Sequence, residues 1–478
     1  MNQKIKIISA LLLIGGLLLV SGCGCKQKTG ANYKVSLEVW GILDDSAAFQ
    51  SIFDNFKKID PNVSSITYKK FDSATYRQEL INALASGQGP DIFVINNTWL
   101  PSFEDKLVAA PANNPQVLSL KKFQDNFVDV TAADFVDKNQ IYATPLSVDS
   151  LALYYNKDLL NQAGITAPPA TWGDFESDVQ KMTQIDSFGN ITQSGAAAGT
   201  AYNINRSTDI LNLLMMQEGT QMVDSNNQPI FDSYITEPDG QNVSPAQSAL
   251  DFYTQFSTAG SLYYTWNPIL HYSIDAFSEG TTAMMINYSW QMATINSEAP
   301  KLNYGVAPIP QFQNGTKLDY ASYWGYAVAK NKIPASSSYG VPNAAPTATD
   351  AERVTEAWKL LTYLTTKPDG TFIGSGGGMG QQANNKLDPA VQYLKATNQP
   401  AARRDLVQAQ LNDPEMAPFA AGNLIDKSWR ESDPNSIEAI FASMIDQVNK
   451  GQTTTSDAIQ AAAQRVRQLT SNSTVSNQ

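Results

Sequence analysis

Cysteine and histidine are nearly absent from this 478-residue sequence. The two cysteines, Cys23 and Cys25, lie near the N-terminus, and His271 is the single histidine. From Thr29 onward there is therefore no thiol pair for a disulfide, no thiol nucleophile and no Cys/His cluster for zinc. A Ser-His-Asp triad would have to use His271, and no serine sits in a Gly-x-Ser-x-Gly motif. We expect no metal, no cofactor and no catalysis.

Positive charge is also scarce. The chain has 33 Lys and Arg against 45 Asp and Glu, a net charge of −12, and loss of Lys4 and Lys6 with a leader would make it −14. This balance argues against a broad nucleic-acid or anionic-lipid surface. Amides and aromatics are plentiful instead, with 20 Tyr, 19 Phe and 8 Trp, which suits neutral, hydroxyl-rich ligands. For each single aromatic, core packing is the alternative.

The apolar run from Ile7 to Val20 is too short for a membrane-spanning helix, which needs roughly 20 residues. Lys4 and Lys6 precede it and small residues follow, a layout typical of a secretory signal peptide. We therefore expect a signal peptide over residues 1–22.

The residues after this run, Val20-Ser21-Gly22-Cys23, resemble the bacterial lipobox, in which the cysteine is lipidated and becomes the new N-terminus. This resemblance implies a palmitate-bearing lipoprotein with a tether over residues 23–34, anchored to the outer face of the cell membrane. The alternative is an ordinary signal peptide with two incidental cysteines. Cys25 is either a free thiol or a second acylation site.

The first part of the mature chain predicts alternating strands and helices. "VSLEVW" has the period-2 alternation of a strand, "SSITYKKF" and "PDIFVIN" predict two more, and helices fall between them. The first helix presents one apolar face and the second, Tyr76 to Ala85, ends at Gly87. Strand, helix, strand, helix, strand implies a mostly parallel sheet covered by helices.

Polar and aromatic residues follow the first and third of these strands. In open α/β sheets, ligands bind outside the carboxyl ends of the strands. We therefore expect a ligand site that includes Trp40, Asp44 and Asp45 after the first strand, and Asn97 and Trp99 after the third.

Five later or overlapping segments resemble one family. They are "ALASGQGPDIFVI", "YATPLSVDSLALYYNKDLL", "GTTAMMINYSWQM", "NYGVAPIPQF" and "GQTTTSDAIQAAAQRV", in order between about Val35 and Leu469. The sequence is similar to the family 1 extracellular solute-binding proteins, the maltose-binding-protein-like receptors of ABC transporters.

The resemblance implies a two-lobe, periplasmic-binding-protein-like (type II) α/β fold with discontinuous lobes and a hinged cleft. Lobe 1 would comprise residues 35–145 and about 326–380, lobe 2 about 146–325 and about 381–470, and a disordered tail 471–478. The chain would cross near Pro145–Asp149, near Tyr323–Val328 and after the Gly-rich segment 374–382. That segment lacks the lysine of a P-loop, so we expect it to supply conformational freedom.

The resemblance also implies ligand contacts. Acidic residues at Asp44, Asp45 and Asp149 would accept hydrogen bonds from hydroxyl pairs, and Trp99 would lie in a contact loop. The further aromatic positions are Tyr288, Trp290, Trp324 and Trp429. In "INNTW" the polar and aromatic residues stand in a different order from that of maltose-binding protein. We therefore expect a carbohydrate ligand, but not specifically maltose.

The implied function is a monomeric, membrane-anchored extracytoplasmic receptor that captures a sugar or oligosaccharide by cleft closure and delivers it to an ABC permease. One alternative is a glycoside hydrolase that uses two of Asp44, Asp45 and Asp149, since such enzymes need only paired carboxylates. Another is a sugar-sensing lipoprotein that binds the same ligand without transport. Neither nucleic acid nor a metal is an expected partner.

Overall fold

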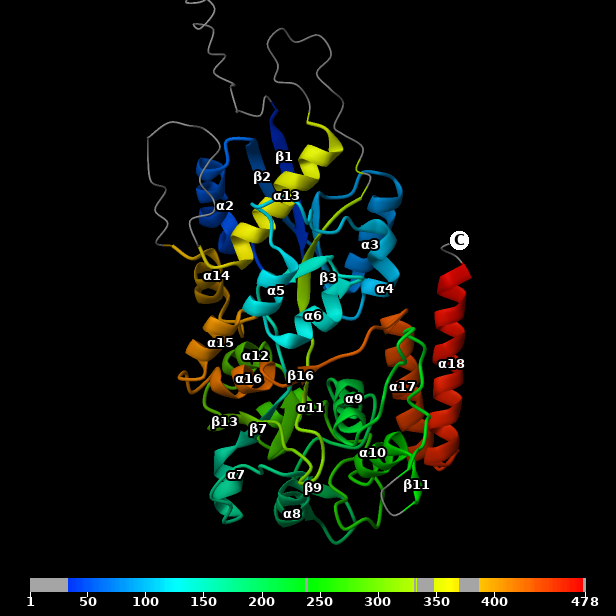
Figure 1. Cartoon of the computed structure of the whole chain (residues 1–478). Coiled ribbons are helices and arrows are strands. Elements are labelled where there is room, and N and C mark those ends of the chain that lie inside the picture. The colour runs from blue at the N-terminus through cyan, green and yellow to red at the C-terminus, as the bar shows by residue number, and fades with distance from the viewer. Residues whose placement is uncertain (1–32, 237–239, 331, 333–347, 369–386, 476–478) are drawn as a thin grey trace, which may run out of the picture.

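The computed structural model describes residues 33–236, 240–330, 332, 348–368 and 387–475. These residues form two lobes, which lie one above the other in Figure 1. Each lobe has its own sheet and its own core of buried apolar side chains. The predicted two-lobe α/β fold is therefore confirmed. The predicted signal peptide, most of the tether with Cys23 and Cys25, and the Gly-rich segment lie outside the described residues.

Lobe 1 is built on a five-stranded sheet in the order β2-β1-β3-β15-β6. β1 is parallel to β2 and β3, whereas β15 is antiparallel to β3 and β6. The alternating Val35, Leu37 and Val39 point into the core, as the period-2 pattern predicts. The strands are β1 (Val35–Gly41), β2 (Val63–Lys70), β3 (Ile92–Asn96), β6 (Ala143–Pro145) and β15 (Trp324–Val328).

Helices cover this sheet. The predicted apolar face of the first helix, α2, is buried through Phe49, Ile52, Phe53 and Phe56, although Ser46 makes no side-chain capping bond. The helices of lobe 1 are α2 (Ala47–Ile59), α3 (Ser73–Ala85), α4 (Leu100–Phe103), the 3₁₀ helix η1 (Glu104–Lys106), α5 (Leu120–Asn126), α6 (Asp129–Phe135), α13 (Asp350–Thr365), α14 (Pro389–Thr397) and α15 (Arg404–Gln410). The hairpin of β4 (Val136–Asp137) and β5 (Gln140–Ile141) follows α6.

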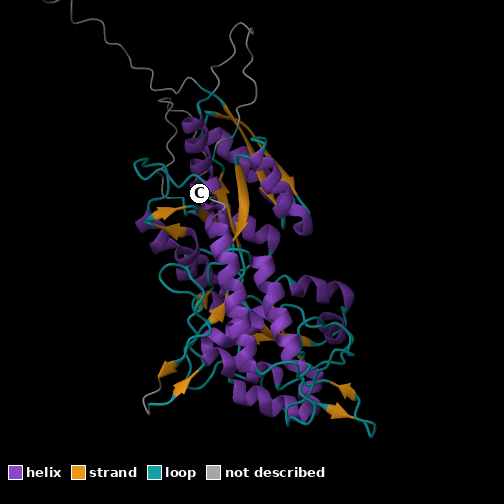
Figure 2. Cartoon of the chain, turned by 90° about the vertical axis from the view of Figure 1, so that its right-hand side faces the viewer, coloured by secondary structure: helices purple, strands orange, loops and turns teal. Residues whose placement is uncertain are grey.

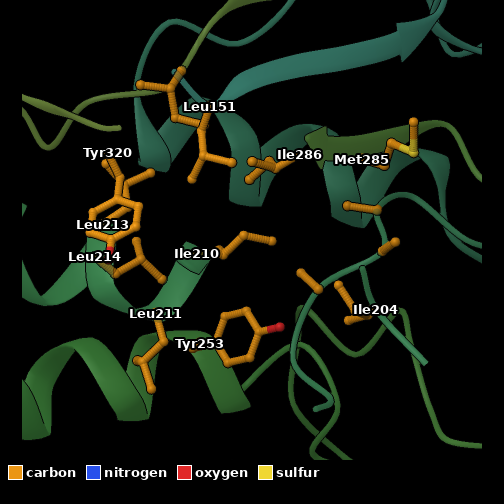
Figure 3. Packing of buried hydrophobic residues seen from close by; sticks show 14 of the residues in the cluster. Leu151, Ile204, Ile210, Leu211, Leu213, Leu214, Tyr253, Met285, Ile286 and Tyr320 are labelled. Atoms are coloured by element: carbon orange, nitrogen blue, oxygen red, sulfur yellow. The ribbon is translucent and has the colours of Figure 1, made fainter. Parts of the chain in front are cut away.

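Lobe 2 contains an antiparallel sheet in the order β12-β7-β13. Figure 3 shows Ile210 and Leu214 of α9 lying between Ile286 of β12 and Tyr253 of α10, so α9 is the central helix of this core. The strands are β7 (Ala152–Asn156), β8 (Gln184–Ile185), β9 (Ile191–Gln193), β10 (Ile235–Thr236), β11 (Asn242–Val243), β12 (Met284–Asn287) and β13 (Tyr304–Pro308). The short hairpins project at the lower end of Figure 2.

The helices of lobe 2 include two long ones, α17 and α18, which pack against each other along one side of the molecule (Figure 1). The helices are α7 (Lys157–Gln162), α8 (Trp172–Met182), α9 (Ser207–Gln217), α10 (Pro245–Thr254), α11 (Ser273–Ser278), α12 (Gln291–Glu298), α17 (Pro434–Asn449) and α18 (Thr455–Val475). α16 (Ala417–Asn423) lies between the lobes and contacts both cores. No helix among the described residues is both long and apolar enough to cross a membrane.

Three segments connect the lobes: residues 146–151, 309–323 and 411–433. They bond to one another at the hinge, where Leu151 N donates to Tyr320 O (3.3 Å) and Ala321 N to Lys427 O (3.0 Å). The second and third segments form a parallel two-stranded ladder of β14 (Asp319–Tyr320) and β16 (Asp426–Lys427). The hinge is therefore a hydrogen-bonded unit and not three independent linkers.

Two predicted boundaries differ from the structure. The prediction assigned residues from about 381 onward to lobe 2, but Ala390, Tyr393 and Val407 pack in the core of lobe 1, and α14 lies against α2. The third connection therefore begins after Val407. The predicted disordered tail is also partly wrong, because α18 continues to Val475; residues 476–478 lie outside the described range.

Candidate ligand-binding site

A cavity of about 700 Å³ lies between the lobes. Its lining comes from the end of β3 in lobe 1, from the starts of α9, α12 and α17 in lobe 2, and from all three hinge segments. The volume lies in the range of roughly 300–1,000 Å³ that is typical of small-molecule sites. Because both lobes contribute walls, a molecule that fills the cavity contacts both.

Five of the ten predicted contact residues line this cavity. They come from the loop after β3, from the first hinge segment, from the turn after β12 and from β15: Asn97, Trp99, Asp149, Trp290 and Trp324. Segments far apart in the sequence therefore converge on one space.

The other five predicted residues do not line it. Trp40 is buried against Phe71, with ring centroids 4.2 Å apart, and its Nε1 donates to Glu38 Oε1 (2.8 Å). Trp429 is also buried, and its Nε1 donates to Asn212 Oδ1 (3.1 Å). For both tryptophans, the core-packing alternative describes the structure, since the indole N–H of each already has a partner inside the protein.

The two acidic residues after β1 also face elsewhere. Asp44 accepts hydrogen bonds from Tyr393 Oη (2.8 Å) and Gln399 Nε2 (3.2 Å), so it ties the first strand end to the segment after α14. Burial raises the pKa of Asp44 to about 6. Asp45 is on the surface and pairs with Lys70 at 3.0 Å. Neither is a wall of the cavity.

The lobe 1 wall carries a tryptophan pair. The rings of Trp99 and Trp324 meet edge to face with centroids 5.0 Å apart. Trp99 also stacks on Phe103 at 5.4 Å and is only 7% exposed. Trp99 is thus a buried support that shows a narrow edge, while Trp324 is partly exposed to the cavity.

The lobe 2 wall carries a larger aromatic platform. Trp290 is 44% exposed and stacks on Tyr288, with centroids 4.5 Å apart and planes inclined by 25°. Tyr288 is fully buried, and its hydroxyl donates to Asp209 Oδ2 (2.8 Å). The prediction that Tyr288 contacts ligand therefore differs from the structure, which places it behind Trp290 as a backing ring.

Asp149 lies at the floor of the cavity and is held by Ser289, from the turn after β12. Ser289 Oγ donates to Asp149 Oδ2 (2.6 Å) and its backbone N–H lies 3.1 Å from the same oxygen. Burial raises the pKa of Asp149 to about 7, and the bonds from Ser289 partly oppose this. The carboxyl group thus joins the first hinge segment to lobe 2.

Asn97 is likewise committed to the protein. Its Nδ2 donates to Asp134 Oδ2 (3.3 Å), and its Oδ1 accepts from the backbone N–H of Tyr323 (3.2 Å). Burial raises the pKa of Asp134 to about 6, against the bonds from Ser428, Tyr323 and Asn97. Asn97 therefore shapes the wall and has little hydrogen-bonding capacity left for a ligand.

Residues 40–371 match the bacterial extracellular solute-binding proteins. The chain belongs to this family. A binding protein of Brucella abortus (strain 2308) is 24% identical over 323 residues, which are 67% of this chain and 68% of that one.

Solved structures of similar proteins share the fold. The sugar-binding protein MalE of Xanthomonas citri is 18% identical, covers 93% of this chain and all of its own, and superposes with a TM-score of 0.69. The cyclic α-maltosyl-1,6-maltose binding protein of Arthrobacter globiformis is also 18% identical, with coverage of 92% and 100% and a TM-score of 0.68.

The solute-binding protein also has cavity residues that the sequence did not single out. They are Arg206, Asp209 and Glu438 on the lobe 2 wall and Glu431 at the end of the third connecting segment. One available signal was "ESDPNS", in which Asp433 caps α17 and so brings Glu431 and Glu438 to the helix start. Arg206, which has a left-handed backbone (φ 63°), gave no comparable pattern.

A second depression of about 1040 Å³ lies on lobe 1 of the solute-binding protein, between η1, the segment after it and the β4–β5 hairpin. It is larger than the interlobe cavity but is lined by one lobe alone. The interlobe cavity is the candidate ligand site, because both lobes line it in the part of the chain that the structure describes, whereas lobe 1 alone lines the larger depression. Among the described residues, no group of three or more His, Cys, Asp or Glu side chains is arranged to hold a metal ion.

Proposed function

We propose that this protein is the membrane-anchored receptor of an ABC importer and that it binds a carbohydrate in the interlobe cavity. The observation that carries the proposal is that aromatic side chains from both lobes face one cavity, Trp324 from lobe 1 and Trp290 from lobe 2. Aromatic faces pack on the C–H faces of sugar rings, and amides, hydroxyls and carboxylates bond their hydroxyl groups. The Xanthomonas and Arthrobacter proteins of the same fold are sugar-binding proteins.

Binding would act through the hinge. A sugar that contacts both walls stabilises the closed arrangement of the lobes by its differential affinity, so the ligand shifts an equilibrium between open and closed forms. The closed receptor would then dock on a permease in the membrane. The lipidated Cys23 would anchor the receptor to that membrane.

The site supports binding better than hydrolysis. Of the three carboxylates considered for a hydrolase, Asp44 and Asp45 lie outside the cavity and Asp149 is bonded by Ser289. Of the other carboxylates in the lining, Asp209 is bonded by Arg206 and Tyr288, and Glu431 and Glu438 lie beside it on the same side of the cavity. A glycosidase needs two carboxyl groups that flank the scissile bond. We therefore propose that the protein releases its sugar unchanged, which chromatography of an oligosaccharide incubated with the protein will check; enzyme-dependent products lost in Asp149→Asn would contradict it.

The carbohydrate proposal is tested by differential scanning fluorimetry and calorimetry against a panel of neutral mono- and oligosaccharides. A ligand at about 100 times its dissociation constant stabilises the protein by about 2.7 kcal/mol, so the melting temperature should rise measurably. If amino acids or peptides shift the melt and no sugar does, the carbohydrate proposal is wrong. Anchoring is tested separately, because Cys23→Ser should release the protein from the detergent phase in a phase-separation assay.

A further inference from the structure

Two carboxylates, one at the end of the third connecting segment and one in lobe 2, face the cavity without a protein partner among the described residues. Glu431, which follows β16, is 7% exposed, and its side chain makes no hydrogen bond or ion pair with the described residues. Its backbone N–H donates to Thr98 O of lobe 1 (3.0 Å), so Glu431 sits where the lobes meet. Glu438, in the first turns of α17, lines the same cavity, is exposed, and is likewise unpaired within the described part of the chain.

The other charged groups of the wall already satisfy one another. Arg206 Nε donates to Asp209 Oδ2 (2.8 Å), and the same carboxylate accepts from Tyr288 Oη. Asp149 is bonded by Ser289. Among the described residues that line the cavity, Arg206 is the single cation, against the acidic Asp149, Asp209, Glu431 and Glu438. The lining is thus acidic, and Glu431 and Glu438 are the two carboxyl groups in it that have no partner among the described residues.

This arrangement is unfavourable for an ionised Glu431 while the cavity is empty. Burial, then the neighbouring carboxylates of Asp209 and Glu438, raise the pKa of Glu431 well above its usual range, and Arg206 only partly opposes them. Asp433, the N-cap of α17, adds to the same effect. A buried carboxyl with no donor costs free energy until a ligand supplies one.

The missing partner has a definite chemistry. A sugar hydroxyl can donate one hydrogen bond to Glu431, but it leaves the repulsion between the carboxylates in place. An ammonium group donates up to three hydrogen bonds and also cancels charge, and both effects are strong in a cavity of low dielectric. A uronic acid or sulfated sugar would add to the repulsion.

We propose that the cavity selects a sugar that bears a protonated amine, and that Glu431 and Glu438 form its ammonium subsite. The inference rests on the proposed carbohydrate function and narrows its ligand class. Glu431 supplies a buried carboxylate, and Glu438 supplies a second carboxylate from the start of α17. Neutral sugars then bind the same walls more weakly.

The test compares ligands that differ only by an amine. Isothermal titration calorimetry at pH 6.5 would use glucosamine with glucose, galactosamine with galactose, mannosamine with mannose, and the glucosamine trimer with cellotriose. We expect the amine to bind at least about tenfold more tightly in one pair or more, which is about 1.4 kcal/mol. Glu431→Gln and Glu438→Gln should each reduce that ratio toward one, while retaining the shape of the site.

Glu298→Gln is the matched control, because Glu298 is an exposed lobe 2 residue outside the cavity lining. It should leave every affinity unchanged. If the hydroxyl member of each binding pair is bound as tightly as the amine, or if both glutamine variants keep the full preference, the amine subsite is overturned while the carbohydrate function stands. If no sugar of either kind binds, both proposals fall. Glu438 is exposed, so its variant remains informative if Glu431→Gln does not fold.

Discussion

Asp319 and Asp426 are direct partners across the parallel β14–β16 ladder, and both are buried, with exposed fractions of 1% and 5%. Neither carboxylate oxygen of Asp426 accepts a hydrogen bond from the residues that the structure describes. Burial raises the pKa of both carboxyl groups well above the usual range. Asp149, on the first hinge segment, adds to the effect on both, and Asp319 and Asp134 of α6 add to the effect on Asp426. Each connection between the lobes therefore brings one buried aspartate to a shared acidic cluster at the hinge.

This cluster predicts that the protein loses stability as the pH rises. A carboxyl whose pKa is higher in the folded state than in the unfolded chain holds its proton more tightly when folded. Its contribution is fully present below the unfolded value and is lost as the pH rises through the folded value. With folded values of about 6 for Asp134 and about 7 for Asp149, against 3.8 unfolded, the free energy of unfolding should fall between about pH 4 and pH 7.

Urea denaturation at pH 5 and pH 8 measures this fall, and Asp426→Asn tests its origin. Asparagine has nearly the shape of a protonated aspartate and stays neutral at every pH. The free energy of unfolding of the variant should therefore fall less between pH 5 and pH 8, and the variant should be more stable than the wild type at pH 8. One pKa unit corresponds to about 1.4 kcal/mol, so a difference on the order of a few kcal/mol is expected. Asp45→Asn, at a surface position that is 80% exposed, should behave as the wild type. An equal fall in Asp426→Asn would show that other groups cause it.

The exposed platform and a core tryptophan should respond differently to truncation. Trp290→Ala should weaken sugar binding at least about tenfold, because large aromatics dominate such contacts, with little change in the melting temperature of the free protein. Trp266 is fully buried in lobe 2, so Trp266→Ala should cost about 3–5 kcal/mol of stability. Calorimetry and thermal melts separate the two effects. An early melt of ligand-free Trp290→Ala would contradict its role as an open platform.

Trp99 combines features of Trp290 and Trp266. It lines the cavity, but it is buried and stacked on Phe103. Trp99→Ala should therefore lower both the affinity for sugar and the melting temperature of the free protein, in contrast to Trp290→Ala. If ligand-free Trp99→Ala melted at the same temperature as the wild type, Trp99 would have to be far more exposed than it is in the structure.

Gly422 in α16 should resist substitution. A β-carbon there would lie 2.6 Å from Asp319 Oδ2 and closer still to Ser150 Oγ, so Gly422→Ala should cost about 1–3 kcal/mol by overpacking the hinge. Gly173 in α8 is exposed, and its β-carbon would meet only Thr171 Oγ1, at 3.9 Å. Gly173→Ala should instead stabilise the protein by up to about 1 kcal/mol, the ordinary helix preference. Urea denaturation measures both variants. If the hinge contact is real, the free energy of unfolding falls in Gly422→Ala and rises in Gly173→Ala.

A buried ion cluster in lobe 1 should be sensitive to loss of its cation. Lys359 pairs with Asp60 and with Glu356 (2.7 Å), and all three side chains are almost fully buried. Lys359→Met leaves two buried carboxylates without their cation and should cost about 3–5 kcal/mol. Lys121 forms an exposed pair with Asp125, so Lys121→Met should change stability by less than about 1 kcal/mol. Similar denaturation midpoints for the two variants would contradict the difference in burial.

The amino-acid sequence alone was sufficient for the first five elements of lobe 1, β1, α2, β2, α3 and β3, and for the family. The alternation of Val35, Leu37 and Val39 and the apolar face of α2 are short-range patterns, so they are legible without knowledge of the fold. The carboxyl ends of the strands also pointed to the loop after β3, which does line the cavity. Composition indicated neither a metal site nor a thiol nucleophile.

Which strand-end residue faces the cavity was decided only by tertiary structure. Trp40 ends one predicted strand and Trp99 follows another, yet Phe71 covers Trp40 and the cavity reaches Trp99. Asp44 is closed off by Tyr393 and Gln399, which are 349 and 355 residues away in the sequence. Glu431 faces the cavity because no such distant partner reaches it. The local sequence pattern predicts whether a segment is a strand or a helix. The exposure of one side chain depends on which remote segment packs over it, and that depends on the whole fold.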